Sequence, residues 1–361
     1  MAKARNAAKK SFWQTITHPK DVSPEDYVRT VRKVTKVIGG AFVVSLIVFL
    51  VLAVVGGWNS VISVIRSANL EIYALAFLSV FLGYLISFGK WEYFMRVVGL
   101  HVPVRENLPV YLSLYSMEFT PGRIGRVITA YTLHRITNIR LINIVPIVTA
   151  DIFTDFLGLG FTALVLAIYL NQDVLLVLVA DLVLTLPFLF FVHDWFYKIM
   201  KKYLIKNPEN LRIFTVYGKE YFESQRKLNK LKVYLVSMGF TIPSSILYAL
   251  SLYFSLAAIG VSMPAASSVF IYSTSQVIGS LSLLPGSVGV ADASFVTLLR
   301  SMGGLGPAVS SAVTIMTRAA SLWFGLLVGG VFFFYTLRYW NLKPSELRGI
   351  GSARRKRRNK N

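Results

Sequence analysis

One uncharged stretch constrains this chain more than any other feature of its sequence. From Val233 to Ala291 there is no Asp, Glu, Lys, Arg or His. That stretch is about twice as long as a tilted membrane-spanning helix requires, because roughly 20 apolar residues cross the hydrocarbon core. The segment must therefore cross the bilayer more than once, or enter it and turn back. The sequence predicts an all-α integral membrane protein with several spans.

Charge is concentrated between the apolar blocks. The formal net charge is +21, and 28 of the 38 Lys and Arg residues lie in segments 1–36, 194–232 and 338–361. Basic segments beside apolar blocks are typical of the cytoplasmic side. We therefore predict a multi-pass protein of the cell membrane with both termini cytoplasmic, and no nucleic-acid partner. The basic tail at residues 354–358 could bind anionic lipid or ribosomal RNA, but a membrane anchor is the favoured interpretation.

Two kinds of functional site are not expected, because the sequence lacks the residues or motifs that they need. The chain has no Cys, which excludes disulfides and thiolate metal sites. It also has no Walker or dinucleotide-binding glycine motif, so we expect no nucleotide, cofactor or metal. The first apolar block follows a long basic leader, so we expect no removable signal peptide.

Six spanning helices are expected from the apolar blocks, at residues 37–55, 72–88, 141–169, 174–192, 233–259 and 307–337. Ser23-Pro24-Glu25-Asp26 predicts the start of a helix that lies on the membrane before the first span. A second interfacial helix is expected around Trp195–Leu204. Lys90 and Trp91 follow the second block in the manner of boundary anchors.

Two semi-polar segments, residues 107–136 and 265–300, each contain a PGxxG motif, at Pro121–Gly125 and Pro285–Gly289. We interpret both as re-entrant helical hairpins that break at the motif, the alternative being a simple kink. With a cytoplasmic N-terminus the first hairpin enters from the inner face and the second from the outer face. This is the inverted repeat with broken helices that is typical of secondary transporters.

The predicted organisation has four parts. These are a basic cytoplasmic leader with an interfacial helix (1–36), a first half with hairpin 107–136 (37–170), a second half with cytoplasmic loop 194–232 and hairpin 265–300 (171–337), and a basic cytoplasmic tail (338–361).

Several ionisable residues fall at membrane depth in this topology. An isolated charge there costs roughly 2.5–3.5 kcal/mol, so such a set needs mutual pairing or water. Asp151 and Asp155 are four residues apart and share a helix face, with Arg123 and Arg126 as their nearest candidate partners in the sequence. The full set is Glu118, Arg123, Arg126, Asp151, Asp155, Asp181, Asp292 and Arg318.

Guanidinium groups suit phosphate because they donate two parallel hydrogen bonds. We predict that Arg123, Arg126 and Arg318 bind an anionic head group, balanced by the acids Glu118, Asp151, Asp155 and Asp292. The breaks at Gly122, Gly125, Gly286 and Gly289 would free backbone groups to face the substrate. The alternative is that the charges form internal ion pairs that lock the helices together, and Asp181 is interpreted as a helix-packing residue.

Enzyme chemistry is disfavoured. Gly286-Ser287 resembles a serine-nucleophile turn, but all four His residues precede the fifth span. Asp151 and Asp155 lie on one helix, whereas an aspartyl dyad needs carboxylates from two facing elements. We expect that the protein is not an enzyme.

At these residues the sequence resembles the flippase-like family related to the transmembrane domain of lysylphosphatidylglycerol synthase, as a stand-alone membrane protein. The resemblance covers roughly residues 37–340 and rests on TPGRIGRVITAYTLHR at 120–135, ADIFTDFLGLG at 150–160, LPGSVGVADASFVTLL at 284–299 and Arg318. Arg126 stands where the family usually has an acid, Ile152 follows Asp151 where Arg is frequent, and Ala291 replaces a basic residue before Asp292. About 24 residues follow the last span, so we expect no aminoacyl-transfer domain.

The resemblance implies lipid translocation. We therefore predict a flippase or scramblase for a phosphate-bearing lipid, either a phospholipid or a polyprenyl-phosphate carrier. The alternative is a non-transporting accessory protein that anchors or positions a lipid-modifying or glycosylation enzyme. The partners expected are an anionic lipid substrate and membrane lipids, and a homo-oligomer is left open.

Overall fold

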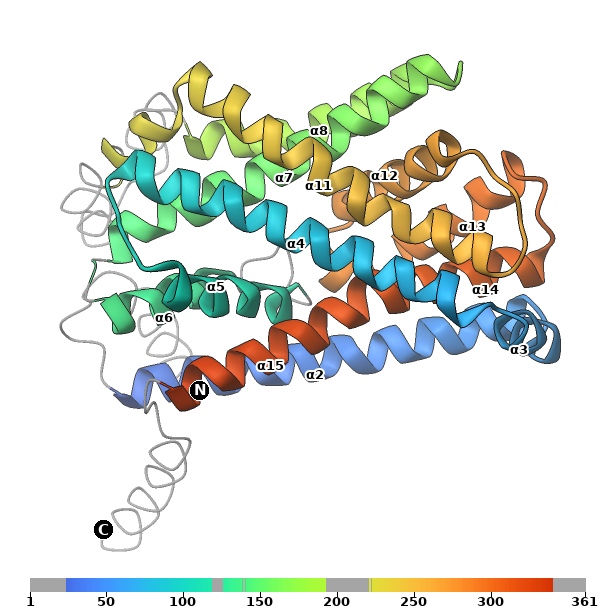
Figure 1. Cartoon of the computed structure of the whole chain (residues 1–361), viewed down its shortest axis with the longest axis horizontal. Coiled ribbons are helices and arrows are strands. Elements are labelled where there is room, and N and C mark those ends of the chain that lie inside the picture. The colour runs from blue at the N-terminus through green and yellow to red at the C-terminus, as the bar shows by residue number, and fades with distance from the viewer. Residues whose placement is uncertain are drawn as a thin grey trace, which may run out of the picture.

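The computed structural model describes residues 24–118, 126–137, 139, 141–192, 221 and 223–339. All regular secondary structure in these residues is helical, and the axes of the long helices are roughly aligned (Figure 1). The predicted interfacial helix at Trp195–Leu204 and the basic tail lie outside the described residues. The prediction of an all-α protein is confirmed.

The helices are α2 (Pro24–Val55), α3 (Trp58–Arg66), α4 (Leu70–Val98), α5 (Val104–Leu112), η1 (Ser113–Met117), α6 (Arg126–Thr137), α7 (Leu141–Tyr169), α8 (Val174–Val192), α11 (Leu231–Ala258), α12 (Ala265–Leu281), η3 (Pro285–Ser287), α13 (Val290–Ser301), α14 (Pro307–Arg318), η4 (Ala319–Trp323) and α15 (Phe324–Tyr339).

Four continuous helical segments are long and apolar enough to cross a membrane. They are Leu70–Val98, Asn143–Tyr169, Leu231–Ala258 and Pro307–Thr336. The bent pair formed by Phe42–Val55 and Trp58–Arg66 could make a fifth span. A helix exists at each of the six predicted positions, and the number of spans that the structure supports is four to five.

The N-terminal region differs from its prediction. We expected an interfacial helix that turns before the first span, but α2 is one continuous helix of 32 residues. The chain bends by 101° only after Val55, where Gly57 with φ 85° starts α3. Gly56 allows this bend because an added Cβ would lie 2.7 Å from Val61 Cγ2. The sharp turn therefore lies at the far end of α2 rather than at its start.

Helices α4 and α11 form the central antiparallel pair. The start of α4 meets the end of α11, where the backbone N–H of Asn69 donates to the Ala258 carbonyl at 2.7 Å. Glycines let the two backbones approach: a Cβ on Gly83 would lie 2.4 Å from the Tyr248 ring. Because each of these helices leads directly into a hairpin, their antiparallel packing places the hairpins α5–α6 and α12–α13 at opposite ends of the molecule (Figure 1).

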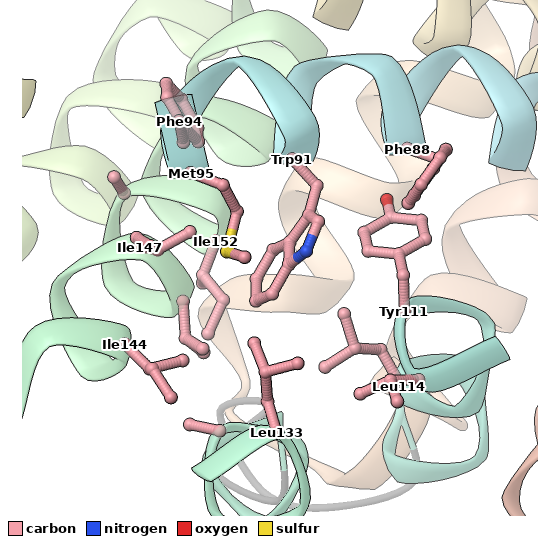
Figure 2. Close-up of a cluster of buried hydrophobic side chains, with 14 of the residues drawn as sticks. Phe88, Trp91, Phe94, Met95, Tyr111, Leu114, Leu133, Ile144, Ile147 and Ile152 are labelled. Carbon is pink, nitrogen blue, oxygen red and sulfur yellow. The ribbon is translucent and has the colours of Figure 1, made fainter. Parts of the chain in front are cut away.

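The first hairpin packs on a buried apolar cluster beside α4 and α7. Large side chains from α4 meet side chains of α5, η1, α6 and α7 in one continuous core (Figure 2). Within a bilayer, close van der Waals packing of such side chains holds the helices together, because lipid tails are as apolar as the core. The cluster includes Phe88, Trp91, Phe94, Met95, Tyr111, Leu114, Leu133, Ile144, Ile147 and Ile152.

The last long helix is interrupted by a turn of π-helix. Helix α14 ends at Arg318, η4 is a π-helix, and α15 continues to Tyr339. Such π-turns are rare and occur frequently at functional sites. Within this last segment, Gly329 of α15 contacts the first hairpin closely, because an added Cβ would lie 2.1 Å from the Ser116 backbone nitrogen.

Candidate functional site

A buried cluster of charges joins α4, the first hairpin and α7. Its centre is Lys90, whose side chain is completely buried. The Lys90 ammonium lies 3.1 Å from Asp151 Oδ1 and 2.5 Å from Asp155 Oδ1, and it donates to Thr154 Oγ1 at 3.2 Å. The shared helix face of Asp151 and Asp155 is what allows one cation to bridge both carboxylates.

Arg126, the first residue of α6, is the second cation of this cluster. Its Nη1 donates to Asp151 Oδ2 at 3.0 Å and to Asp155 Oδ2 at 3.1 Å. Its Nη2 contacts Glu118 Oε1, on the other arm of the same hairpin. The expected pairing of Arg126 with Asp151 and Asp155 is therefore present, and it ties the hairpin to α7.

The interpretation of Lys90 and Trp91 as boundary anchors is wrong. Both side chains are fully buried, and α4 continues past them to Val98. Trp91 donates its indole N–H to Asn107 Oδ1 at 3.1 Å. Two carboxylates of α7 compensate the Lys90 charge, which would be too costly in an apolar surrounding without them.

A second, smaller ion pair joins the other hairpin to the last long helix. Arg318 Nε lies 2.8 Å from Asp292 Oδ1, and both side chains are only 1% exposed. Arg318 Nη2 also donates to the Gly286 carbonyl at 2.7 Å. No described residue accepts a hydrogen bond from Nη1 of this guanidinium.

The turn of the second hairpin has an unusual backbone. Leu283, Gly286 and Ser287 have φ values of 53°, 63° and 56°. For the two residues with a Cβ this left-handed conformation costs of order 1–3 kcal/mol each and persists only when the surroundings hold it. Arg318 supplies that support, because it binds both the turn carbonyl and the carboxylate at the start of α13.

We expected the freed backbone groups near Gly289 to face a substrate, and one of them does not. The Gly289 N–H donates to Asp292 Oδ2 at 2.8 Å, so the helix start is capped by its own acid. This Asp292 cap neutralises part of the helix dipole that would otherwise attract an anion. The cation of Arg318 is then the stronger anion-binding feature of the second hairpin.

Between the two ion clusters lies a cavity of about 150 Å³. Helices α4, α7, α11 and α12, both hairpins and the π-turn contribute to its lining. Its charged residues come from both clusters, and its apolar residues include Val80, Phe156 and Leu159. The charged lining residues are Glu118, Arg126, Asp155 and Arg318.

Tyrosines form one wall of this cavity. Tyr248 OH lies 2.8 Å from Ser87 Oγ and 3.1 Å from Tyr115 OH, and Tyr115 OH lies 3.3 Å from Tyr111 OH. The ring of Tyr84 packs on that of Tyr115 with centroids 3.8 Å apart. This hydroxyl chain crosses from α4 and α11 to the first hairpin, and it was not foreseen because its members are far apart in sequence.

The predicted site residues divide into four groups. Glu118, Arg126, Asp151 and Asp155 are gathered in the first cluster, and Asp292, Arg318, Gly286 and Gly289 in the second. Arg123, Gly122 and Gly125 lie outside the described residues. Asp181 of α8 sits against Gly160, where an added Cβ would lie 1.8 Å from its Oδ1.

Among the described residues, no three side chains of His, Cys, Asp or Glu are placed so that they could hold a metal ion. Within each cluster, the acidic and basic side chains pair with each other instead. What the arrangement can do chemically is to offer hydrogen-bond donors and acceptors to a polar group inside an apolar bundle.

Fold and site together define a class: a multi-pass helical membrane protein with a charged cavity among its helices. The family model described as lysylphosphatidylglycerol synthase TM region matches residues 37–329. Because that match covers most of the chain, the protein belongs to this family, as the sequence motifs predicted.

A relative supports the same assignment. A UPF0104 membrane protein from Methanothermobacter thermautotrophicus is 26% identical over 262 residues, which cover 65% of this chain and 76% of the relative. That protein is likewise a membrane protein.

Proposed function

We propose that this protein is a flippase or scramblase that moves the head group of a phosphate-bearing lipid through the cavity between its two halves. The observation that carries the proposal is the cavity itself, which brings charged residues of both hairpins together inside an apolar bundle. A lipid head group needs such a polar path because its passage through bare hydrocarbon is too costly. The acyl or prenyl chains would remain in the surrounding lipid.

The arrangement of the two halves supports an alternating pathway. Helix α4, hairpin α5–α6 and α7 have counterparts in α11, hairpin α12–α13 and the α14–α15 segment, and α4 is antiparallel to α11. In secondary transporters, interrupted helices in corresponding positions of inverted halves mark the substrate site. We infer the same relation here, with the two hairpins lining the path of the head group.

Arg318 is the proposed phosphate ligand. It lines the cavity, and its Nη1 has no acceptor among the described residues. Arg126 also lines the cavity but already contacts three carboxylates. We therefore assign Arg318 to the phosphate and Arg126 mainly to holding the first hairpin against α7.

The orientation proposed from the charge distribution is a cytoplasmic location of both termini in the cell membrane. The start of α2 and the end of α15 lie at the same end of the molecule (Figure 1). An even number of crossings between them is consistent with that placement, and the basic segments at 1–36 and 338–361 favour the inner face.

The test is translocation in liposomes. The protein is reconstituted with a fluorescent phospholipid, and the fraction that becomes accessible to an external quencher is followed with time. We expect the double variant Arg318→Gln with Asp292→Asn to lose at least tenfold in translocation rate, because it removes the proposed phosphate ligand. Both partners of the ion pair are neutralised so that neither is left as an unpaired buried charge. Arg300→Gln is the matched control, because Arg300 is exposed in the last turn of α13.

Equal rates in protein-containing and protein-free liposomes, with folded protein present, would refute the proposal. A protein that only anchors or positions another enzyme would show that result and would be indifferent to the double variant. A lipid-modifying enzyme would instead change the mass of the lipid, which mass spectrometry of the same liposomes detects.

A further inference from the structure

We propose that the outer face of the α7–α8 pair docks a membrane-spanning helix of another protein, which places a Lys or Arg side chain on Asp181. This surface is separate from the cavity, whose lining includes no residue of α8. The inference therefore does not depend on lipid translocation. It is drawn from an acid without a counter-ion, from the apolar side chains beside that acid, and from the cations of the bundle.

Asp181 is the only charged residue of α8, and it lies inside an apolar stretch. It stands about 10 Å from the start of the helix, because each residue adds 1.5 Å along the axis. Helices α7 and α12, against which α8 packs, contain no basic residue. Within the described part of the chain no cation pairs with Asp181, and its buried Oδ1 atom accepts no hydrogen bond. An ionised carboxylate at this depth needs a partner.

Gly160 of α7 makes room for this carboxyl group. An added Cβ there would lie 1.8 Å from Asp181 Oδ1 and 2.5 Å from Asp181 Oδ2. The carboxyl group therefore lies directly on the α7 backbone, and a larger residue at Gly160 would displace it. Asp181 is still partly exposed, so a helix that covers this face can reach it. Packing between α7 and α8 explains the contact with Gly160, but it supplies no counter-ion.

Exposed apolar side chains flank Asp181 on both helices. On α8, Leu178 and Leu182 are 37% and 45% exposed, and on α7, Phe161 and Val165 are 49% and 46% exposed. Helix α12 packs against both α7 and α8 from the inner side, so these side chains share the outer side of the pair. A helix that packs there would meet apolar side chains around one acid. Close packing and a polar contact of this kind are what hold membrane helices together.

A second copy of this chain does not offer the required cation. The basic side chains inside the described part of the bundle are Lys90, Arg126 and Arg318, and all three are buried and already contact carboxylates. A twofold interface through this face would instead bring two Asp181 carboxylates together, because each partner presents the same surface. Charge complementarity thus favours a different protein with a basic residue in its span.

The probes are two synthetic membrane-spanning peptides. Both are Leu/Ala helices of about 23 residues, and one has a central Lys where the other has Leu. The chain has no Cys, so Tyr169→Cys, at a 75% exposed position at the end of α7, takes a donor dye. Energy transfer to an acceptor on the peptide is titrated in liposomes. We expect the Lys peptide to associate roughly fivefold more tightly than the Leu peptide.

Asp181→Asn removes the charge and keeps the shape of the side chain. We expect this variant to lose the preference for the Lys peptide and to keep its rate of lipid translocation, because Asp181 does not line the cavity. Asp173→Asn is the matched control. Asp173 is an exposed acid directly before α8, so its replacement should leave the preference unchanged.

The apolar part of the surface has a test of its own. Phe161→Ala with Val165→Ala removes exposed side chains beside the acid, and we expect weaker association of both peptides. Leu327→Ala with Val331→Ala is the control, because these residues of α15 are each 66% exposed and lie on another helix. An equal effect of the two double variants would overturn the assignment of docking to the α7–α8 pair.

The other outcomes are equally decisive. Equal association of the two peptides, or a preference that persists in Asp181→Asn, would overturn the proposal. Energy transfer between two labelled copies of the protein that is lost in Asp181→Asn would overturn it in favour of a second copy. A translocation rate that falls in this variant without any peptide preference would assign Asp181 to transport. A peptide preference in a protein that moves no lipid would support this inference and refute only the proposed function.

Discussion

The two hairpins are tied to their neighbouring long helices by ion pairs of opposite arrangement. In the first half the hairpin supplies the cation, Arg126, and the long helix supplies Asp151, 25 residues later. In the second half the hairpin supplies the acid, Asp292, and the long helix supplies Arg318, 26 residues later. The two linked residues are separated by nearly the same number of positions in both halves, and the acid and the base have changed places.

The two hairpins differ in how many charged groups take part in the ion pairs that attach them to the long helices. The first is a network of two cations and three carboxylates, completed by Lys90 of α4, whereas the second is a single pair plus one turn carbonyl. A dense network of buried charges holds its members in one arrangement, because each carboxylate would lose several partners at once. We therefore expect the first hairpin to be the more rigidly held side of the cavity and the second to be the more adaptable side.

The largest expected effect is at Lys90. Replacement of Lys90 by Met removes one of the two cations that compensate Asp151 and Asp155, and breaking a buried pair from one side costs about 3–5 kcal/mol. We expect a lower unfolding temperature in detergent and a smaller yield of monodisperse protein. Lys232→Met is the control, because Lys232 of α11 is exposed. Equal unfolding temperatures for the two variants would mean that the first network is not a structural anchor.

Gly329→Ala tests the attachment of the first hairpin to α15. The new methyl group would meet the Ser116 backbone, which cannot move without the hairpin, so we expect a loss of about 1–3 kcal/mol of stability. Gly330→Ala is a neighbouring control, because an added Cβ there meets nothing within 4 Å. Thermal unfolding of both variants checks this, and a Gly330→Ala variant that is the less stable of the two would contradict it.

Gly279→Ala applies the same test to the second hairpin. An added Cβ would lie 2.6 Å from the Ala291 Cβ and 2.9 Å from the Ser287 Cβ. These atoms belong to the hairpin itself, so its arms can separate slightly, and we expect a loss of about 1 kcal/mol with a larger effect on translocation than on stability. The control is Gly239→Ala, which meets nothing within 4 Å. A stability loss above that of Gly329→Ala would reverse the assignment of fixed and adaptable sides.

The smallest expected effect is at Tyr248, which lies between the two sides. Tyr248→Phe removes the hydroxyl that contacts Ser87 and Tyr115, and a neutral hydrogen bond contributes about 0.5–1.5 kcal/mol. We expect a small decrease in unfolding temperature. Tyr253→Phe, at a partly exposed position of the same helix, serves as the comparison. An equal decrease there would mean that the hydroxyl chain does not contribute to stability.

The sequence predicts the helices well where apolar composition decides them. Helix α7 has the predicted bounds, and α11 differs from its prediction by two residues at the start and one at the end. The pairing of Arg126 with Asp151 and Asp155 was also predictable, because the two acids share one face of α7 and Arg126 is one of the cations nearest to them in the sequence. The opposite arrangement of charges in the two halves involves only residues that were predicted as site residues: Arg126, Asp151, Asp292 and Arg318.

Other features depend on contacts that no local pattern reveals. Lys90 follows an apolar run and precedes Trp91, which is the composition of a membrane boundary, and its true partners are 61 and 65 residues away. The π-turn after Arg318 and the hydroxyl chain through Tyr248 likewise arise from packing between distant helices. The bend after Val55 was missed because Gly56-Gly57 lies inside a largely apolar region.

The burial of Lys90 has a consequence for how the chain is made. Its ammonium is synthesised about 60 residues before its counter-ions, so α4 leaves the ribosome with an unbalanced charge near its C-terminal third. We expect that charge to keep this part of α4 near the bilayer surface until α7 supplies its carboxylates. Stable insertion of α4 would then depend on a helix that is synthesised later.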